Sequence, residues 1–406
     1  METRELQAVV NPVYTTAKGT IMMLTAGGDP DARKLAPYLD LSEVQKGGSA
    51  TPPEIRRCYI VAQEARYGIY NEAALKSRKP VIVDLPCGYS PRGFYTTDAG
   101  KTYFGFDLPI VIDEMKEASK KCMSEQQWAA STFAAVDATN YESLRNALGE
   151  IKGELCIVTE GLLGYLSESE LISMCQAVHK LLAEFGGCWI TADSGILEIY
   201  TLTFGTLLKG DQKAFLARIK GHASRMADVE FYQNSIFLKG PDGAKSFLNS
   251  QGFNVNAESV SEYLPELRTV SGEEFQQLKN AYRKMEIWTM TLNQTGIKTE
   301  KPIDPNLPFE VKSELKDGLF NVSVQGRMDT LTAPELLKQF QEARKGVEAI
   351  RVDVSRMPYV SSAGLRVLMM MYKSLTDKEK FEMTGVNENV REILETTGFD
   401  QFLLKE

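Results

Sequence analysis

The chain has 406 residues, a formal net charge of −8 and 43% hydrophobic residues. This length predicts more than one domain, and the composition is typical of a soluble globular protein. An acidic balance without a concentrated basic stripe argues against nucleic acid as a main partner. No apolar run approaches the length of a membrane span and the N-terminus does not resemble a secretory signal, so we expect a cytoplasmic protein that binds no membrane.

Histidine-dependent and metal-dependent chemistry are not expected. The chain has two histidines, His179 and His222, and neither lies near a plausible nucleophile motif. A zinc site built from His and Cys pairs is equally unsupported, so we expect no metal. The six cysteines show no paired spacing, which predicts reduced thiols rather than a disulfide framework.

A linker is predicted at residues 293–308, NQTGIKTEKPIDPNLP, which contain three prolines and no long apolar run. It divides the chain into a first domain over 1–292 and a second domain over 309–406. Residues 1–75 are expected to form a helical cap. Residues 196–230 also look helical and interrupt the rhythm of strands and helices, so they are a candidate lid.

The first domain is predicted to be α/β, because apolar strand-like runs alternate with helical stretches. The runs lie at 81–85, 103–108, 132–137, 154–163 and 186–193. Such alternation indicates a parallel sheet with both faces covered by helices. Ser167 and Glu170 form a capping-box pattern, which predicts the start of one of these helices.

Acidic residues stand at the ends of four strand-like runs. They are Asp84, Asp107, Asp137 and Glu160. Ligands of open parallel sheets bind beyond the carboxyl ends of the strands, so these acids are expected to line a site. Four carboxylates would repel phosphates and favour a cationic ligand that carries a ribose, such as S-adenosylmethionine. The alternative is that each acid only caps the helix that follows it.

Four stretches together carry a resemblance to a known family. They are PVIVDLPCGYSPRG (from residue 80), YFGFDLPIVIDEMK, AAVDATN and IVTEGLLGYLSESEL, in this order. They resemble the leucine carboxyl methyltransferase family, which belongs to the class I S-adenosylmethionine-dependent O-methyltransferases. The resemblance covers roughly residues 55–290 and implies a Rossmann-like class I methyltransferase sheet. Pro86 replaces the family's first loop glycine and Ser90–Pro91 replace its Asp-Thr, so the loop is not a GxGxxG cradle.

The resemblance implies S-adenosylmethionine as the cofactor and suggests which residues bind it. Gly88 would pass close to the methionine moiety, since glycine lets a backbone approach a ligand. Asp107 would hold the ribose hydroxyls, while Asp137 and Ala138 would bracket the adenine. Asp84 heads the loop and is included in the cofactor site.

Two further positions face the amino-acid end of the cofactor in this interpretation. Glu160 would lie beside it, and Arg66 sits about where the family has an arginine for the cofactor carboxylate. An ordinary surface arginine is the alternative for Arg66. Tyr165 is a candidate catalytic residue, with a packing role as the alternative.

The second domain predicts the order β-β-α-β-α-β-α, a small α/β domain with one helical layer. GRMDTLTAPEL, VDVSRMPYVSSAGLRVL and TGVNENVREILETTGF resemble a STAS domain, the fold of anti-sigma factor antagonists. That resemblance implies an anti-sigma factor or a serine kinase as a partner, and Ser362 as a phosphorylation site. Ser361 stands where the family has an aspartate. The alternative is that this serine pair only caps a helix.

Methyl transfer from a sulfonium to an ionised carboxyl group needs alignment and exclusion of water, with no obligatory base. The sequence therefore predicts an O-methyltransferase acting on a carboxyl group of a small molecule or peptide, with a STAS domain for regulation or partner binding. The alternative is a non-catalytic signalling protein of the anti-sigma factor antagonist type, whose first domain senses a nucleoside metabolite. A dehydrogenase is disfavoured, because Ser90, Pro91 and Arg92 stand where its third fingerprint glycine is needed.

Overall fold

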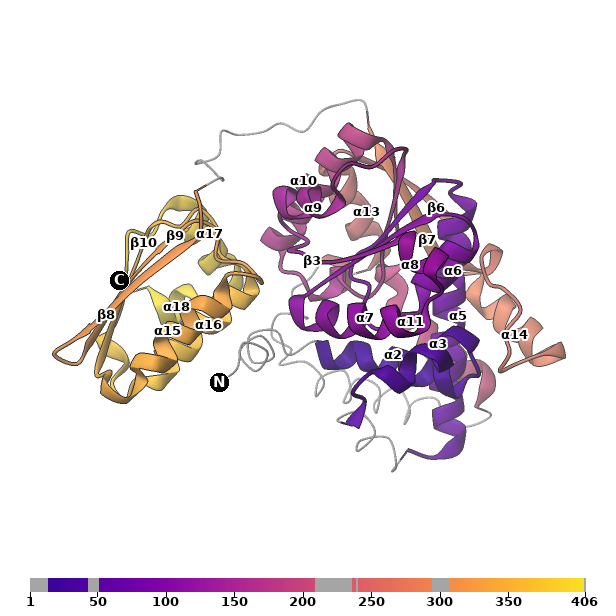
Figure 1. Cartoon of the computed structure of the whole chain (residues 1–406), viewed down its shortest axis with the longest axis horizontal. Helices are drawn as coiled ribbons and strands as arrows, with labels where there is room; N and C mark the ends of the chain where they lie inside the picture. Colours follow the sequence, from indigo (N-terminus) through magenta and orange to yellow (C-terminus); the bar gives the residue numbers. More distant parts are fainter. Residues whose placement is uncertain (1–13, 43–50, 209–235, 239, 294–306, 405–406) are drawn as a thin grey trace. The chain divides into compact units, whose positions relative to one another are not determined.

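The computed structural model describes most of the chain. The described residues are 14–42, 51–208, 236–238, 240–293 and 307–404. Two compact units are present, one built from Val13–Leu166 with Leu171–Gly296 and one built around Ile297–Glu406 (Figure 1). Most of the predicted linker lies outside the described residues, so the predicted boundaries stay a prediction.

Helices precede the sheet of the first unit, as expected for a helical cap. They are α2 (Tyr14–Ala26), α3 (Pro30–Leu35), the short 3-10 helix η1 (Ala36–Tyr38) and α5 (Pro53–Lys76). Asp29 caps α3 by accepting hydrogen bonds from the amides of Asp31 and Ala32, and Pro30 follows it at the first helical position. The prediction of helix in this region is confirmed for the residues described.

The first unit contains one seven-stranded sheet. Its strands are β1 (Val81–Asp84), β2 (Thr102–Asp107), β3 (Ser131–Ala135), β4 (Leu155–Thr159), β5 (Gly187–Thr191), β6 (Phe253–Ser259) and β7 (Glu286–Leu292). Their order is β3-β2-β1-β4-β5-β7-β6, and β7 runs antiparallel to both of its neighbours. The Rossmann-like class I sheet is confirmed, and its strand order reverses between β1 and β4, where such sheets bind ligands.

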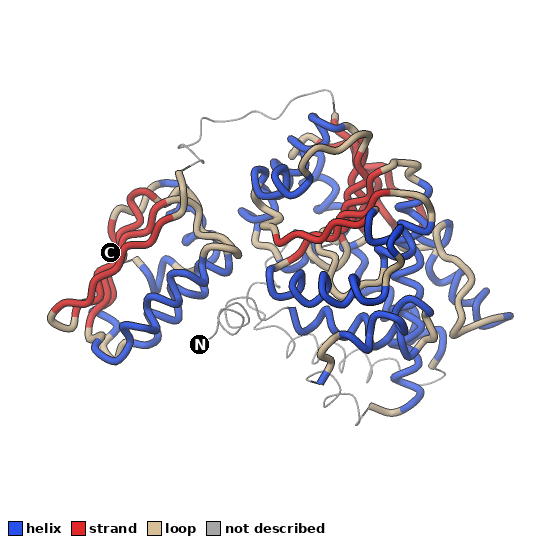
Figure 2. The backbone as a smooth tube through the Cα atoms, in the orientation of Figure 1, coloured by secondary structure: helices blue, strands red, loops and turns tan. Residues whose placement is uncertain are grey.

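Helices cover both faces of this sheet (Figure 2). They are α6 (Arg92–Asp98), α7 (Pro109–Cys122), α8 (Glu125–Ala129), α9 (Tyr141–Leu148), α10 (Glu168–Phe185), α11 (Ile196–Leu207), α13 (Pro241–Ser250) and α14 (Gly272–Tyr282). Side chains of β1 alternate between two buried cores: Val81 and Val83 join the core that contains residues of α10, and Ile82 joins the core that contains residues of α5. Burial on both faces explains why the strands read as continuous apolar runs.

Two local predictions have clear outcomes. The capping box is confirmed, because the Ser167 amide donates to Glu170 Oε2 at 2.8 Å and the Glu170 amide donates to Ser167 Oγ at 3.4 Å. Of the predicted helical stretch 196–230, the first part is the helix α11. Its remainder, which carried the lid prediction, lies outside the described residues apart from Leu208. Among the described helices, none combines the length and the apolar character that crossing a membrane requires.

The second unit has the predicted order of strands and helices. Its elements are β8 (Glu310–Lys316), β9 (Leu319–Gln325), α15 (Ala333–Ala343), β10 (Ala349–Arg356), α16 (Ser362–Ser374), β11 (Phe381–Thr384), α17 (Glu388–Thr397) and α18 (Asp400–Leu403). The sheet order is β11-β10-β9-β8, and only β8 pairs antiparallel among these strands. Asp317 and Gly318 both have positive φ, which closes the β8–β9 hairpin as a tight turn. The helices form one layer against one face of the sheet (Figure 1).

The β4–β5 pair requires glycine at residue 187. Gly187 has φ +113°, and an added Cβ would lie 1.9 Å from the Leu155 carbonyl oxygen. Gly187→Ala is therefore expected to destabilise the first unit by about 3 kcal/mol or more. Urea unfolding followed by tryptophan fluorescence measures this, because all three tryptophans lie in that unit.

Gly243→Ala is the matched control, since Gly243 lies in helix α13 with open space around it. This variant should be neutral or more stable by up to about 1 kcal/mol. Equal effects of the two substitutions would contradict the steric explanation.

Candidate functional site

The loop after β1 continues the sheet before it turns. The Leu85 amide donates to the Val158 carbonyl oxygen and the Cys87 amide donates to the Phe106 carbonyl oxygen, both at 2.9 Å. The Leu85–Pro86 peptide bond is cis, and Gly88 has φ +50°, a backbone conformation that favours glycine. The loop therefore keeps a glycine at the position where its conformation demands one.

Asp107, at the end of β2, faces this loop. Its Oδ2 accepts a hydrogen bond from the Gly88 amide and its Oδ1 accepts one from the Leu108 amide, each at 2.7 Å. The side chain is buried, and burial raises the pKa of the Asp107 carboxyl to about 7 against the lowering effect of the two amides. Each carboxylate oxygen can still accept one more hydrogen bond.

A buried arginine that was not predicted as a site residue, Arg92, joins two of the predicted acids. Its Nη1 lies 2.5 Å from Asp84 Oδ1, and its Nη2 lies 2.5 Å from Glu160 Oε2. Its Nε donates to Asn71 Oδ1 of α5 at 2.8 Å, while the Tyr103 hydroxyl donates to Asp84 Oδ2. Arg92 is 1% exposed and Asp84 is fully buried, so the ion pairs are shielded from water.

Arg66 of α5 completes this charge network from the other side. Its Nε lies 2.6 Å from Glu160 Oε1, so Glu160 lies between two guanidinium groups. Burial alone would raise the pKa of the Glu160 carboxyl, but Arg66 and Arg92 hold that pKa below its usual value. A Cβ on Gly161 would lie 2.8 Å from Arg66 Nη2, so the glycine after Glu160 leaves room for the guanidinium.

These pairs change the charge argument drawn from four acids. Asp84 and Glu160 are neutralised by Arg92 and Arg66, and Asp107 is held by backbone amides. The expectation of an uncompensated acidic site is therefore wrong for Asp84 and Glu160. At these two strand ends, two buried carboxylates are balanced by two buried guanidinium groups.

A second anchor that the sequence reasoning missed is Asp193, which follows β5. Its carboxylate accepts hydrogen bonds from three consecutive amides, those of Gly161, Leu162 and Leu163, at 2.8–2.9 Å. The Tyr70 hydroxyl donates to Asp193 Oδ1 at 3.1 Å. Asp193 thus fixes the loop that begins directly after Glu160. The rule that strand-end acids mark a site would have found it, because the fifth predicted run ends at residue 193.

The remaining predicted residues of the first unit lie at the same edge of the sheet. Asp137 follows β3, is buried, and its Oδ1 accepts from the Thr139 amide and hydroxyl at 2.9 and 2.8 Å. Ala138 packs against a buried core. Tyr165 ends the short 3-10 helix Leu163–Tyr165 and is half-buried. Direct contacts thus join Gly88 with Asp107. Arg66 contacts Glu160 directly and is connected to Asp84 through Arg92. Asp137, Ala138 and Tyr165 are not part of these contacts.

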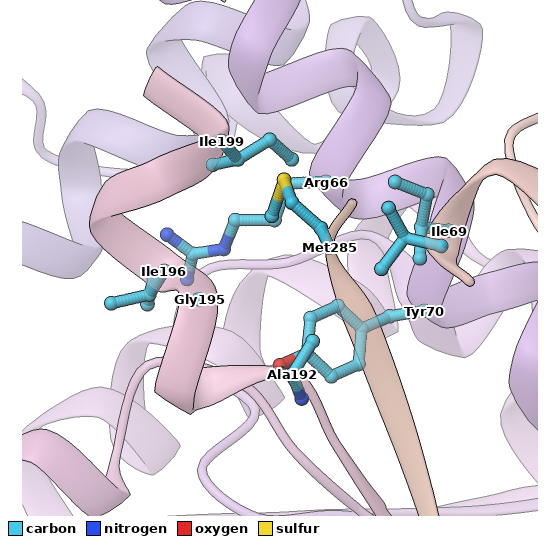
Figure 3. A pocket seen from close by; sticks show the side chains of 9 residues that line it. Arg66, Ile69, Tyr70, Ala192, Gly195, Ile196, Ile199 and Met285 are labelled. Atoms are coloured by element: carbon cyan, nitrogen blue, oxygen red, sulfur yellow. Dashed lines mark hydrogen bonds between the residues drawn. The ribbon is translucent and has the colours of Figure 1, made fainter. Parts of the chain in front are cut away.

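A pocket opens beside Arg66, between α5 and α11 (Figure 3). Its lining is mostly apolar and comes from residues far apart in the chain. The lining residues are Arg66, Ile69, Tyr70, Ala192, Gly195, Ile196, Ile199, Val260 and Met285. The pocket therefore borders the charge network on one side and aliphatic side chains on the other.

In the second unit, Ser361 and Ser362 begin helix α16. Ser361 is 1% exposed and caps the helix, because its hydroxyl accepts from the Gly364 amide at 3.3 Å. Its own amide donates to the Met328 carbonyl oxygen at 2.9 Å. Ser362 is the first helical residue and is half-buried. Ser361 is therefore the N-cap of α16, and the Ser362 hydroxyl is not used for capping.

Arg92→Met is expected to lower the free energy of unfolding by about 3–5 kcal/mol, because Asp84 would stay buried without its counter-charge and Glu160 would lose one of its two arginine partners. The loss should shrink at pH 5 relative to pH 8, since an acid deprived of its partner takes up a proton more readily as pH falls. Urea unfolding at both pH values checks this.

Arg57→Met is the control, because the Arg57–Glu274 ion pair has side chains 45% and 37% exposed. Removing it should cost less than about 1 kcal/mol. A loss for Arg92→Met as small as for this control would show that the buried network does not hold the strand ends together.

Comparisons with known proteins match the second unit in sequence. The family model described as Mlab, STAS domain, matches residues 314–405. BtrV of Bordetella bronchiseptica, named as a candidate anti-sigma factor antagonist, is 31% identical over 85 residues, which are 20% of this chain and 73% of that protein. An anti-sigma-B factor antagonist of Listeria monocytogenes is 25% identical over 101 residues, covering 24% of this chain and 87% of that protein.

Solved structures similar to the larger part of the chain include an O-methyltransferase family protein from Burkholderia thailandensis. The match has 11% sequence identity, covers 69% of this chain and 73% of that chain, and has a TM-score of 0.34. A TM-score this low is not evidence of shared chemistry. The function of the first unit has to be argued from its own residues.

Proposed function

Through residues 314–405 the chain belongs to the STAS domain family, and we propose that this domain regulates, or recruits partners to, an S-adenosylmethionine-dependent O-methyltransferase formed by the first unit. The acceptor in this proposal is a carboxyl group on a small molecule or peptide. The resemblance of the loop and strand-end motifs to the leucine carboxyl methyltransferase family supports it. The Rossmann-like sheet, with antiparallel β7 between β5 and β6, is compatible with this proposal.

The observation that carries the proposal is the contact between Asp107 and Gly88, which lies in the loop after β1, the strand next to the point where the strand order reverses. One free acceptor position on each Asp107 oxygen suits the two hydroxyls of a ribose, which are hydrogen-bond donors. Gly88 at positive φ presents backbone without a side chain beside that carboxylate. These residues fit the nucleoside part of S-adenosylmethionine, with Asp137 and Ala138 proposed for the adenine.

The other end of the cofactor would meet Arg66 and Glu160. Arg66 uses Nε for Glu160, and its Nη1 makes a hydrogen bond of 3.5 Å, the limit of that interaction, to the Tyr200 hydroxyl. The guanidinium can therefore take a stronger acceptor, such as the cofactor carboxylate. Glu160 would lie beside this end of the cofactor and orient the Arg66 guanidinium, and Asp84 would act through Arg92 by holding Glu160 in place.

S-adenosylmethionine supplies a methyl group that is already activated by its sulfonium. A carboxyl acceptor is ionised at neutral pH, so the protein's task is to align the two reactants and to exclude water. The aliphatic side chains that line the small pocket beside Arg66 would help to keep water from this end of the site. Tyr165 follows β4 at the same edge of the sheet and is proposed to contribute to the acceptor side.

Asp107→Asn should weaken binding of S-adenosylhomocysteine by tenfold or more, about 1.4 kcal/mol, because an amide cannot accept at both oxygen positions. In the wild type the affinity should rise with pH through about 7, where the Asp107 carboxyl loses its proton. In Asp107→Asn this pH dependence should disappear. Calorimetric titration from pH 5.5 to 8.5 measures both effects.

Asp113→Asn is the matched control, because Asp113 is an exposed acid in the second turn of α7. It should bind like the wild type at every pH. Failure of the wild type to bind S-adenosylhomocysteine at millimolar concentration would contradict the proposed cofactor.

A second candidate function is a non-catalytic signalling protein whose first unit senses a nucleoside metabolite. It is favoured by the pairing of Glu160 with two arginines, which leaves less free negative charge beside a sulfonium. A sensor of this kind would bind S-adenosylhomocysteine in the titration above. In an acceptor screen with radiolabelled S-adenosylmethionine, it would transfer no labelled methyl group to any carboxylic acid.

For the STAS domain we propose an anti-sigma factor or a serine kinase as partner, with phosphorylation at Ser362. A phosphate at the first residue of α16 would meet the helix N-terminus, where backbone amides favour anions. The proposal rests on the position of Ser362 beside the cap residue Ser361.

Ser362→Ala should abolish phosphorylation by a serine kinase of the anti-sigma type, as read by mass spectrometry, and leave stability nearly unchanged. Ser361→Ala should retain phosphorylation and cost about 1 kcal/mol of stability, because it removes the helix cap. Phosphate found on Ser361 in the wild type would reverse the two roles.

A further inference from the structure

Two cysteines that are distant in the sequence lie beside each other near the starts of β4 and β5, at the ends of these strands that are opposite the candidate site. Cys156 is the second residue of β4 and Cys188 is the second residue of β5. They are paired in register on neighbouring parallel strands, and both side chains belong to the same buried core. Each thiol is close enough to the other to shift its pKa.

This register meets the Cα-separation condition for a disulfide. Neighbouring strands lie about 4.7–4.9 Å apart, which is inside the roughly 4.4–6.8 Å range of Cα separations in disulfides. In-register residues of parallel strands also point to the same face. Among the six cysteines, all of which lie in described ranges, the other four make no comparable contact with a cysteine.

The charges around the pair favour one sulfur as the nucleophile. The interaction between the two thiols lowers the pKa of the Cys188 thiol and raises the pKa of the Cys156 thiol. Lys79 also favours the Cys188 thiolate, while Glu154, which pairs with Lys79 at 2.9 Å, opposes it. On the Cys156 side, Ser77 and Lys101 favour the thiolate, although the net shift is upward.

Both residues are buried, and Cys188 is the more exposed of the two, at 3% against 0% for Cys156. The two residues before Cys188, Gly186 and Gly187, have no side chains that could cover it. The Lys79 and Glu154 side chains beside it are 24% and 56% exposed. A small oxidant would therefore approach Cys188 from the side of Lys79 and Glu154.

We infer that Cys156 and Cys188 form a reversible disulfide on exposure to a peroxide, so that this edge of the sheet is a redox modification site. The inference does not depend on the proposed function. It concerns β4 and β5, whose other ends lead to Glu160 and Asp193, so the covalent link would join two strands that support the candidate site.

The reaction balances in two steps. The Cys188 thiolate attacks one peroxide oxygen, an S–O bond forms as the O–O bond breaks, and hydroxide leaves to become water. The Cys156 sulfur then attacks the sulfenic sulfur of Cys188. The S–S bond forms, the S–O bond breaks, and a second water leaves with the Cys156 proton. Two thiols lose two electrons, and one peroxide is reduced to two waters.

The test uses the full chain and hydrogen peroxide. After brief treatment, remaining thiols are alkylated in denaturant and the digest is analysed by mass spectrometry. We expect a linked peptide that contains Cys156 and Cys188 and that disappears after treatment with dithiothreitol. Cys122, which is half-buried and has no cysteine partner of this kind, serves as the internal reference. Oxidation of Cys122 with both Cys156 and Cys188 still fully alkylated would overturn the inference.

Two variants sharpen the result. Cys156→Ala should stop the reaction at the sulfenic acid, which dimedone traps on Cys188. Cys58→Ala removes a buried cysteine elsewhere and should leave the linked peptide unchanged. If Cys156→Ala does not fold, the disulfide-linked peptides of the wild type are sufficient for the test. A link between any other pair of cysteines would refute the assignment to Cys156 and Cys188.

Discussion

Burial of the Arg92 guanidinium is the constraint on which the strand ends of the first unit depend. An ion taken out of water must be paired and hydrogen-bonded. The three partners of Arg92 come from separate parts of the fold. They are Asp84 of β1, Glu160 directly after β4, and Asn71 of α5. The network can form only when these elements are docked in one arrangement. Its charges therefore specify where α5 lies on the sheet as well as stabilising it.

The same pairing sets the electrostatics of the candidate site. Because Asp84 and Glu160 are neutralised by arginines, the acid that remains open to a ligand through its oxygens is Asp107, held by the amides of Gly88 and Leu108. A site of this kind selects its ligand through hydrogen-bond geometry more than through net charge. Hydroxyl groups and a carboxylate meet suitable partners at its two ends, as the proposed cofactor requires.

In the first unit, the two ends of the parallel strands carry different chemistry. The carboxyl ends of the strands carry the charge network, and the opposite edge carries the Cys156–Cys188 pair. Both edges involve β4 and β5, whose backbones are tightly joined, since Gly187 leaves no room for even one additional carbon atom next to Leu155. The STAS domain is a separate unit with its own sheet.

The sequence by itself determined what depends on local pattern. Alternation of apolar runs predicted the α/β sheet, the Ser167–Glu170 pair predicted a helix start, and the STAS motifs predicted the second unit. Tertiary structure decided what depends on residues distant in the chain. No spacing rule pairs Arg92 with Glu160, or Cys156 with Cys188, because those contacts exist only once strands lie side by side. Charge balance and thiol chemistry are therefore properties of the folded arrangement, whereas periodicity is a property of the chain.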